Sequence, residues 1–198
     1  MFTGIVQGTG RIKAIDIHEH HRTLTIELPD ATTLATGGSV AIDGVCLTAV
    51  DIDMNIVKFD VIEETLLRTT LGIKEVDSLV NVERSLKFGD EIGGHLLSGH
   101  IMDTGTVLDI QSSDTTMNVL IATPPSVQPY IVEKGYVAIN GVSLTIGAVE
   151  SDTFWLHLIP ETLRLTTCDS FEVGQTLNIE IDSTTQVIVE TVRRFMEK

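Results

Sequence analysis

Apolar and polar residues alternate with a period of two along much of this chain. Apolar side chains occupy every second position in residues 24–28, 57–61 and 177–181. This period is typical of a strand that buries one face. Asp-Gly at 43–44 and Asn-Gly at 140–141 stand between strand-like runs, and these dipeptides favour tight hairpin turns. The pattern therefore predicts an all-β chain of short strands joined by hairpins.

The pattern changes at the C-terminus. Residues 183–198, "STTQVIVETVRRFMEK", carry apolar side chains at roughly helical spacing: Val187, Val189, Val192, Phe195 and Met196. We expect a helix over 186–196, capped at its start by the Ser/Thr cluster. This helix stands outside the β pattern, so we expect its apolar stripe to pack against another subunit.

The chain also repeats itself. "VAIDGVCLT" at 40–48 returns as "VAINGVSLT" at 137–145, an offset of 97. Other blocks recur in the same order: "EETLLRTT" as "PETLRLTT", residues 79–83 as 176–180, and, at an offset of 95, residues 3–12 as 98–107. Ordered blocks of this kind indicate a duplicated domain. The "ETLLRTT" and "ETLRLTT" segments predict a helical turn or two within each half.

Five or six short strands in each half predict a small closed barrel. The repeat places the first domain at 1–95 and the second at 96–185, with an oligomerisation helix at 186–198.

Composition narrows the function. Of 198 residues, 42% are hydrophobic and 21% charged, which is typical of a globular protein, and the formal charge is -15. That charge repels polyphosphate, so we expect no nucleic-acid partner. No apolar run approaches the roughly 18 residues of a membrane span. The N-terminus does not resemble a signal peptide, and two cysteines do not form a disulfide framework. We therefore expect a cytoplasmic protein without a membrane partner.

The positions at which the halves differ are candidates for chemistry. Cys46 matches Ser143, and two interpretations stay open: a small half-buried residue of either type, or a polar atom lining a ligand pocket. Thr48 and Thr145 lie two positions further on, on the same strand face. Three other matched pairs also differ: Ile5 with His100, Gly37 with Lys134, and Asp60 with His157.

Other features predict little chemistry. Cys168 matches Leu71, which favours a place in the core. His95 and His100 are five residues apart, and this spacing fits no convincing metal site. The chain has no phosphate-binding loop, dinucleotide fingerprint, nucleophile elbow or CxxC motif. We therefore expect two similar pockets, no metal and no bound cofactor.

Several segments together resemble the riboflavin synthase family, over the whole chain. These are "MFTGIVQGTG", "DGVCLT", "EIGGHLLSGHI", "NGVSLT" and "IPETLRLTT". The resemblance implies two tandem six-stranded Greek-key barrels and a C-terminal helix that supports a homotrimer. It also implies that two molecules of 6,7-dimethyl-8-ribityllumazine exchange a four-carbon unit, giving riboflavin and 5-amino-6-ribitylamino-uracil, between barrels of neighbouring subunits. Lumazine proteins, which bind the same chromophore without catalysis, share the fold and are the alternative.

The resemblance also implies site residues. The first pocket would hold Gly4, Ile5, Val6, Cys46, Leu47, Thr48, Asp60, Val61, Ile62, Glu63, Glu64 and Thr65. The second would hold Gly99, His100, Ile101, Lys134, Ser143, Leu144, Thr145, His157, Leu158, Ile159, Pro160, Glu161 and Thr162. The family makes Ser39, Cys46, His100, Ser143 and Asp182 candidates for catalysis.

One departure from the family pattern lies in the repeated turns. Family members often carry Asn before the first repeated Gly and Asp before the second, whereas this chain has Asp43 and Asn140. Both residues suit the turn, so we expect the exchange to leave the fold intact. Retention of Cys46, His100, Lys134 and Ser143, with "GGHLLSGH" intact, favours the enzyme over the non-catalytic protein.

Overall fold

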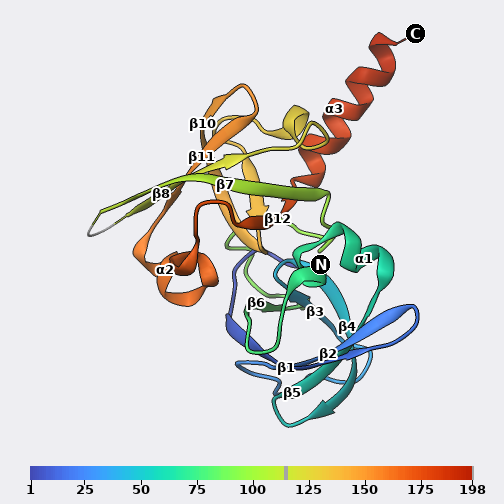
Figure 1. Ribbon diagram of the computed structural model, residues 1–198. Helices are drawn as coiled ribbons and strands as arrows, with labels where there is room; N and C mark the ends of the chain where they lie inside the picture. Colours follow the sequence, from blue (N-terminus) through green and yellow to red (C-terminus); the bar gives the residue numbers. More distant parts are fainter. Residues whose placement is uncertain (114–115, 198) are drawn as a thin grey trace.

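Two closed β-barrels, one from each half of the chain, form the body of the molecule (Figure 1). The computed structural model describes residues 1–113 and 116–197. The barrels lie against each other, and a C-terminal helix projects from the second one. The predicted pair of six-stranded barrels with a terminal helix is therefore confirmed.

The first barrel has the strand order β1-β2-β5-β4-β3-β6, with every neighbouring pair antiparallel. This order is a Greek key, because β2 pairs with β5 and not with β3, the next strand in the chain. The chain crosses over after β2, and β3 pairs with β4 and β6. Its elements are β1 (Gly8–Ile17), β2 (His21–Glu27), β3 (Ser39–Ile42), β4 (Val45–Asp53), β5 (Ile56–Ile62), α1 (Glu63–Arg68), η1 (Thr70–Ile73) and β6 (Leu79–Arg84).

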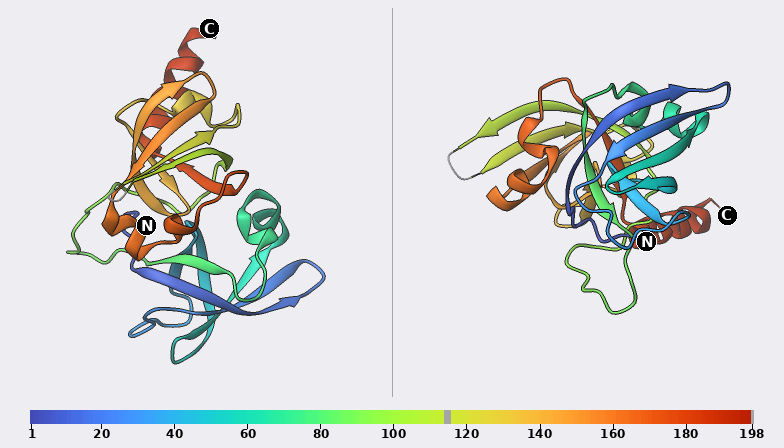
Figure 2. Two further views of the ribbon diagram at one scale, coloured as in Figure 1. Left: turned by 60° about the vertical axis from the view of Figure 1, so that its left-hand side comes forward. Right: turned by 90° about the horizontal axis from the view of Figure 1, so that it is seen from below.

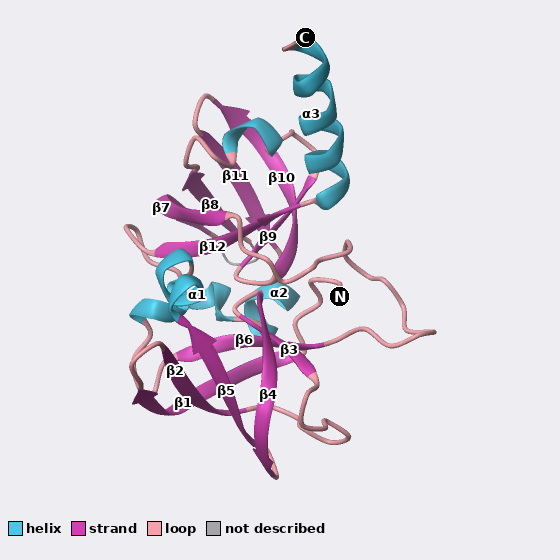
Figure 3. Ribbon diagram, turned by 90° about the vertical axis from the view of Figure 1, so that its right-hand side faces the viewer, coloured by secondary structure: helices cyan, strands magenta, loops and turns pink. Residues whose placement is uncertain are grey.

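The second barrel repeats this topology as β7-β8-β11-β10-β9-β12. Its elements are β7 (Asp103–Ser112), β8 (Met117–Ala122), η2 (Gln128–Tyr130), β9 (Tyr136–Ile139), β10 (Val142–Glu150), β11 (Thr153–Leu158), α2 (Pro160–Leu165), η3 (Thr167–Ser170) and β12 (Thr176–Ile181). The helical turns predicted in each half are α1 and α2, and both lie near the level where the barrels meet (Figure 3).

The repeated turns form as their dipeptides predict. Asp43 and Gly44 join β3 to β4 with φ of 44° and 80°, and Asn140 and Gly141 join β9 to β10 with 46° and 81°. Two consecutive positive φ angles define the type I′ turn, whose twist matches that of the flanking strands. Glycine accepts the second of these angles without strain.

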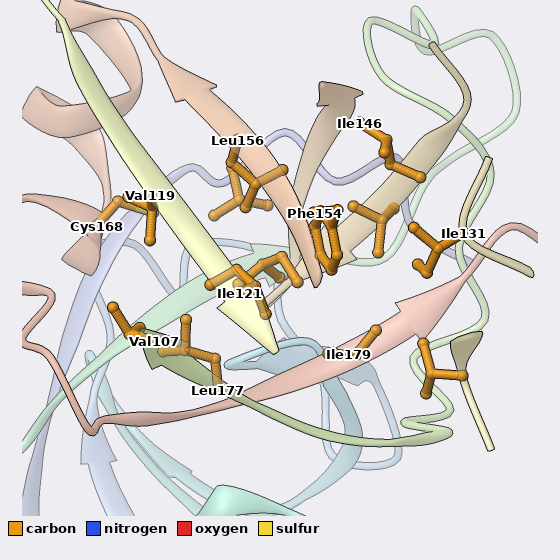
Figure 4. Close-up of a cluster of buried hydrophobic side chains, with 14 of the residues drawn as sticks. Val107, Val119, Ile121, Ile131, Ile146, Phe154, Leu156, Cys168, Leu177 and Ile179 are labelled. Carbon is orange, nitrogen blue, oxygen red and sulfur yellow. The ribbon is translucent and has the colours of Figure 1, made fainter. Parts of the chain in front are cut away.

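Side chains fill both barrels, so the interior offers no channel. The alternating residues at 24–28, 57–61 and 177–181 point inward and are buried, as predicted. In the second barrel Phe154 packs among aliphatic side chains from the surrounding strands (Figure 4). Cys168 belongs to this core and burial raises the pKa of its thiol to about 12, so it is an unreactive core residue, as expected.

The two halves meet around a pseudo-twofold axis. Phe2 and Leu97 exchange two backbone hydrogen bonds of 2.8 and 2.9 Å, and their side chains pack with Ala41 and Ala138. The chain between β6 and β7 runs out as a loop beside the N-terminus before it returns to this axis (Figure 2). Residues near positions 2 and 97 are therefore placed between the barrels.

A buried polar network also crosses the axis. The Asn81 amide donates to the Asn140 carbonyl, and the Asn178 amide donates to the Asp43 carbonyl, each at 2.9 Å. Asp43 Oδ2 forms an ion pair of 2.7 Å with Lys74 Nζ. Buried backbone groups at the two turns are thereby satisfied by side chains from the opposite half.

Helix α3 (Ser183–Met196) begins three residues earlier than predicted, and its cap differs from the prediction. Asp182 is the N-cap: its Oδ2 accepts hydrogen bonds from the Thr185 N–H and hydroxyl at 2.8 and 2.9 Å. The expectation that the Ser/Thr cluster caps the helix is wrong, because a carboxylate one residue earlier accepts the free N–H. Val189 packs on the second barrel, and the Tyr130 hydroxyl donates to Glu190.

Most of the apolar stripe of α3 remains exposed in the single chain. Val187 is 65% exposed and Val192 51%. Within residues 1–113 and 116–197, no helix combines the length and apolar character that crossing a membrane requires.

Two candidate ligand pockets on the outer walls of the barrels

Two short segments leave the pseudo-twofold axis and cross to the opposite barrel. The Gly4 carbonyl accepts a hydrogen bond from the Ser143 N–H on β10 at 2.9 Å, and the Gly99 carbonyl accepts one from the Cys46 N–H on β4 at 2.9 Å. Val6 then joins the core of the second barrel, and Ile101 joins the core of the first. The N-terminal segment is thus part of the second barrel's wall, and the segment after the linker is part of the first barrel's wall.

The crossing requires glycine at both contacts. Gly4 and Gly99 have φ of +74° and +80°, and a Cβ on either would lie 2.5 Å from the Cβ of Ser143 or Cys46. Any other residue would meet both a strained backbone angle and a steric clash. The repeated "TG" and "SG" steps of the sequence therefore mark close approaches of backbone to strand.

Each crossing segment borders a cavity on the outer wall of its barrel. The first pocket, of about 320 Å³, is lined by Val45, Cys46, Glu64, Thr65, Arg68, Thr69, Gly99, His100 and Ile101. The second pocket, of about 210 Å³, is lined by Gly4, Ile5, Val6, Val142, Ser143, Ile159, Glu161, Thr162, Leu165 and Thr166. Nine positions of the two linings are equivalent in the repeat register, and the two linings share no residue.

The structure divides the crossing segments between the two cavities differently from the predicted allocation. We expected Gly4, Ile5 and Val6 in the Cys46 pocket and Gly99, His100 and Ile101 in the Ser143 pocket. The structure exchanges these sets, because each segment crosses the axis before it reaches a strand. Equivalence within the repeat does not reveal which barrel a segment joins.

The exchange also redistributes the chemistry. The first pocket combines Cys46 with His100 and Arg68, whereas the second has Ser143, Ile5 and Leu165 at the equivalent positions. The first pocket is the more polar of the two at these three positions. At its rim Arg68 Nε donates to Glu64 at 2.7 Å.

Ser143 in the second pocket has a histidine partner. His95 Nδ1 lies 2.7 Å from Ser143 Oγ, and the imidazole stacks on Tyr136 with 5.2 Å between ring centroids. Burial lowers the pKa of His95, and the charge of Asp182 opposes this shift. In the neutral tautomer that carries its proton on the buried Nε2, Nδ1 accepts from the Ser143 hydroxyl and is positioned as its base. Within the described part of the chain, no histidine nitrogen is bonded to Cys46 in the same way.

Two buried glutamates hold the crossing segments. Glu83 on β6 accepts hydrogen bonds from the Thr3 N–H, the Thr3 hydroxyl and the Gly4 N–H at 2.7, 2.9 and 3.0 Å. Glu180 on β12 accepts from the Ser98 N–H and hydroxyl at 2.7 and 2.8 Å, and from the Gly99 N–H. Burial raises the pKa of each carboxyl, and the donors oppose that shift.

Several predicted site residues lie in the same strands as the pockets but turn their side chains inward. Leu47, Val61 and Leu158 are buried in the barrel cores, and Leu144 packs against the second core. Their side chains are unable to contact a ligand in the pockets described here, because alternate residues of a strand face opposite sides.

Other predicted residues are exposed beyond the two linings. Thr48, Thr145, Ile62, Glu63 and Pro160 all face solvent. Asp60 accepts from the Thr23 hydroxyl at 2.7 Å, and His157 Nδ1 lies 2.7 Å from Asn118 Oδ1, so both are bonded to the neighbouring strand. Their roles in ligand binding stay predictions.

Three remaining candidates have local structural roles. Ser39 lies on β3 opposite Thr48. Lys134 occupies a turn with φ of 65°, its N–H bonded to the Ile146 carbonyl at 2.9 Å, and its side chain is exposed. Asp182 caps α3, as described above. None of the three lines either pocket.

A larger cavity, of about 570 Å³, lies between the β1–β2 hairpin and α1. Among the predicted site residues only Glu63 borders it. Its lining shares only Arg68 and Thr69 with the first pocket and shares no residue with the second, so its size alone does not identify it as the site.

Sequence reasoning missed His95, Arg68, Glu83 and Glu180. A visible signal existed for the glutamates, because "VE" at 82–83 and "IE" at 179–180 repeat in register. The sequence offers His95 only as a candidate metal ligand, and no local signal indicates its contact with a serine 48 residues away.

Comparison with known proteins identifies the same two repeats. Residues 3–85 and 98–182 each match the lumazine binding domain family. The chain is 48% identical to riboflavin synthase of Escherichia coli (strain K12), over 99% of this chain and 93% of that protein. It is 43% identical to riboflavin synthase of Chlamydia pneumoniae (99% and 97%) and 40% identical to that of Mycobacterium bovis (99% and 98%).

Solved structures with the same fold include ligand complexes of LumP. LumP with 6,7-dimethyl-8-(1'-D-ribityl) lumazine superposes with a TM-score of 0.83 at 28% identity, and LumP with riboflavin superposes with 0.84 at 31%. Each comparison covers 91% of this chain and 99% of that chain.

Proposed function

Since the chain belongs to the riboflavin synthase family, we propose that its two outer-wall pockets are the two substrate sites of that family's reaction. The chain is an enzyme that makes riboflavin by dismutation of two 6,7-dimethyl-8-ribityllumazine molecules. The observation that supports the sites is the pair of equivalent pockets. A reaction between two copies of one substrate needs two copies of one binding site, and the duplication supplies them.

The differing residues would separate the roles of the two substrates. One lumazine loses a proton from its C7 methyl group, and the other receives a nucleophile on its ring. In the second pocket the Ser143 hydroxyl is poised to give its proton to neutral His95. In the first pocket Cys46 and His100 line the equivalent wall. Alignment of two rings at an interface supplies the rest of the acceleration.

The direct test is incubation of the purified protein with 6,7-dimethyl-8-ribityllumazine alone. We expect riboflavin fluorescence to grow without any added cofactor. Loss of the C7 methyl proton leaves an anion, and the conjugated ring system of the substrate delocalises its negative charge. Binding of lumazine that stays unchanged would support the non-catalytic alternative. The LumP complexes make lumazine and riboflavin the natural ligands to titrate.

We further propose that the enzyme works as a homotrimer, with the first pocket of one subunit facing the second pocket of its neighbour. The two linings of one chain share no residue and each pocket lies on its own barrel, which supports a reaction site completed by another copy of the chain. Exposed isoleucines at equivalent positions, Ile62 and Ile159, 59% and 58% exposed, suit such a contact. Cytoplasmic location stays a prediction.

Helix α3 should hold this assembly together. We expect the double substitution Val187→Ser/Val192→Ser to lower the oligomeric state in sedimentation analysis and to lower activity with it, because both side chains are exposed in the single chain. Val173→Ser is the matched control, since Val173 is equally exposed, at 65%, but precedes β12 rather than following it. A fully active monomer would contradict the shared site.

A further inference from the structure

The carboxylates of Glu83 and Glu180 link each barrel to the pocket of the other. Glu83 extends from β6 of the first barrel, yet the segment that it binds lines the second pocket. Glu180 extends from β12 of the second barrel, and its segment lines the first pocket. Both side chains are buried, 5% and 4% exposed, and each receives hydrogen bonds through both backbone and hydroxyl donors.

The bonded groups lie next to the lining residues. Gly4, whose N–H is bound by Glu83, uses its carbonyl to bind Ser143. Gly99, whose N–H is bound by Glu180, uses its carbonyl to bind Cys46. A single glycine therefore links each carboxylate to a pocket residue of the opposite barrel. Gly4 links Glu83 to Ser143, and Gly99 links Glu180 to Cys46.

We infer that Glu83 and Glu180 are positioning residues of the reaction, each acting on the pocket of the barrel to which it does not belong. Glu83 sets the second pocket by fixing Gly4, Ile5 and Val6 against Ser143. Glu180 sets the first pocket by fixing Gly99, His100 and Ile101 against Cys46. The inference rests on the proposed pockets and adds a crossed dependence between the halves.

Substitution by glutamine keeps the size of each side chain but replaces one acceptor oxygen with an NH₂ donor. The NH₂ group must then face N–H donors of the crossing segment, because both carboxylate oxygens accept from backbone N–H groups. A lost charge-assisted hydrogen bond should weaken ligand binding in the affected pocket by about tenfold. The other pocket should change by less than about twofold, since its own tether is intact.

A cysteine reporter can measure each pocket separately. Cys46 is half-buried in the first pocket, whereas Cys168 is buried in the core with a raised pKa. Alkylation of the native protein by iodoacetamide therefore reads Cys46, and riboflavin in the pocket should protect it. The double substitution Cys46→Ser/Ser143→Cys moves the thiol to the second pocket, where the repeat already shows that both residue types fit.

The experiment titrates riboflavin against alkylation, read by peptide mass spectrometry, in both reporter backgrounds. Glu180→Gln should raise the half-protecting riboflavin concentration at Cys46 and not at the thiol introduced at position 143; Glu83→Gln should do the reverse. An effect of each variant on its own barrel's pocket, equal effects on both, or no effect would overturn the inference. Absence of protection in the unsubstituted chain would instead count against the proposed pockets.

Milder variants serve if either glutamine variant fails to fold. Ser98→Ala and Thr3→Ala each remove one hydroxyl donor and leave the carboxylate in place. We expect the same crossed pattern at about threefold, the loss of a weaker hydrogen bond. If the two variants have equal melting temperatures but affect opposite pockets, the effect is positioning and not general destabilisation. Identical protection curves in both pockets would again overturn the inference.

Discussion

Ser143→Ala should lower kcat by about 100-fold and change riboflavin binding by less than about threefold, because proton transfer contributes on this scale. The substitution removes the hydroxyl that lies 2.7 Å from His95 Nδ1 and leaves the backbone contact with Gly4 unchanged. His95→Gln should have a similar effect. Since the two side chains act as a unit, the double variant should be little worse than either single variant.

Single-turnover kinetics beside equilibrium titration would make this measurement. Ser170→Ala is a suitable control, because that hydroxyl is exposed and donates only to the Thr167 carbonyl. Additive losses in the double variant would show that Ser143 and His95 act separately. Wild-type rates in all three variants would show that neither side chain takes part in proton transfer and that alignment of the two rings accounts for catalysis.

The pH dependence has a defined sign. Burial lowers the pKa of His95 below 6.5, so the folded protein keeps a neutral imidazole at pH values where an exposed histidine is already charged. Activity should therefore fall only when the pH drops below the lowered pKa of His95. In His95→Gln the remaining activity should no longer fall at this acidic pH. The unfolded chain binds the proton first, so the free energy of unfolding should also fall as pH drops from about 6.5 towards the lowered pKa.

The sequence was sufficient for the barrels because local pattern and tertiary structure agree there. Alternation at 24–28 and the Asp-Gly turn at 43–44 each specify a strand or hairpin without reference to distant residues. The repeat register then indicated which positions are equivalent. Cys46 and Ser143 line equivalent cavities and are both half-buried, and the binding of a ligand there stays a proposal.

The crossing could not be predicted in the same way. Gly4 and Gly99 are equivalent whether each joins its own barrel or the other, so the register alone leaves both arrangements possible. The choice depends on the path of a few residues across the axis. Glu83 and Glu180 were also obscured, because a charged residue at a strand end is normally exposed, and only the crossing segments supply the donors that make burial tolerable.

Lys74→Met should lower the free energy of unfolding by about 3 kcal/mol, the cost of leaving a buried charge without its partner. Asp43 is fully buried, and Lys74 Nζ lies 2.7 Å from its Oδ2. The melting temperature should fall by roughly 6–12 °C for a chain of this length. Lys58→Met is the control, because Lys58 pairs with Asp51 at an exposed site and should cost at most about 1 kcal/mol.

The second half of the repeat indicates a further substitution that should restore the stability lost in Lys74→Met. In the second half the position of Lys74 is held by Phe171, and the position of Asp43 by Asn140, whose Oδ1 accepts from the Asn178 N–H at 2.8 Å. The half with Asp at the turn thus has a lysine at the later position, and the half with Asn has an apolar residue there. Lys74→Met/Asp43→Asn should therefore regain stability to within about 1 kcal/mol of the original chain.

The loss should affect both barrels at once. Asp43 Oδ1 accepts from the Asn81 N–H in its own barrel, and its carbonyl accepts from the Asn178 amide in the other. Trp155, the only tryptophan of the chain, lies on β11 and reports the second barrel, while hydrogen exchange of the β5 amides reports the first. In Lys74→Met the two probes should give coincident unfolding curves, because the network belongs to both barrels. Loss of the first barrel while Trp155 keeps its native fluorescence would show that the ion pair stabilises one barrel alone.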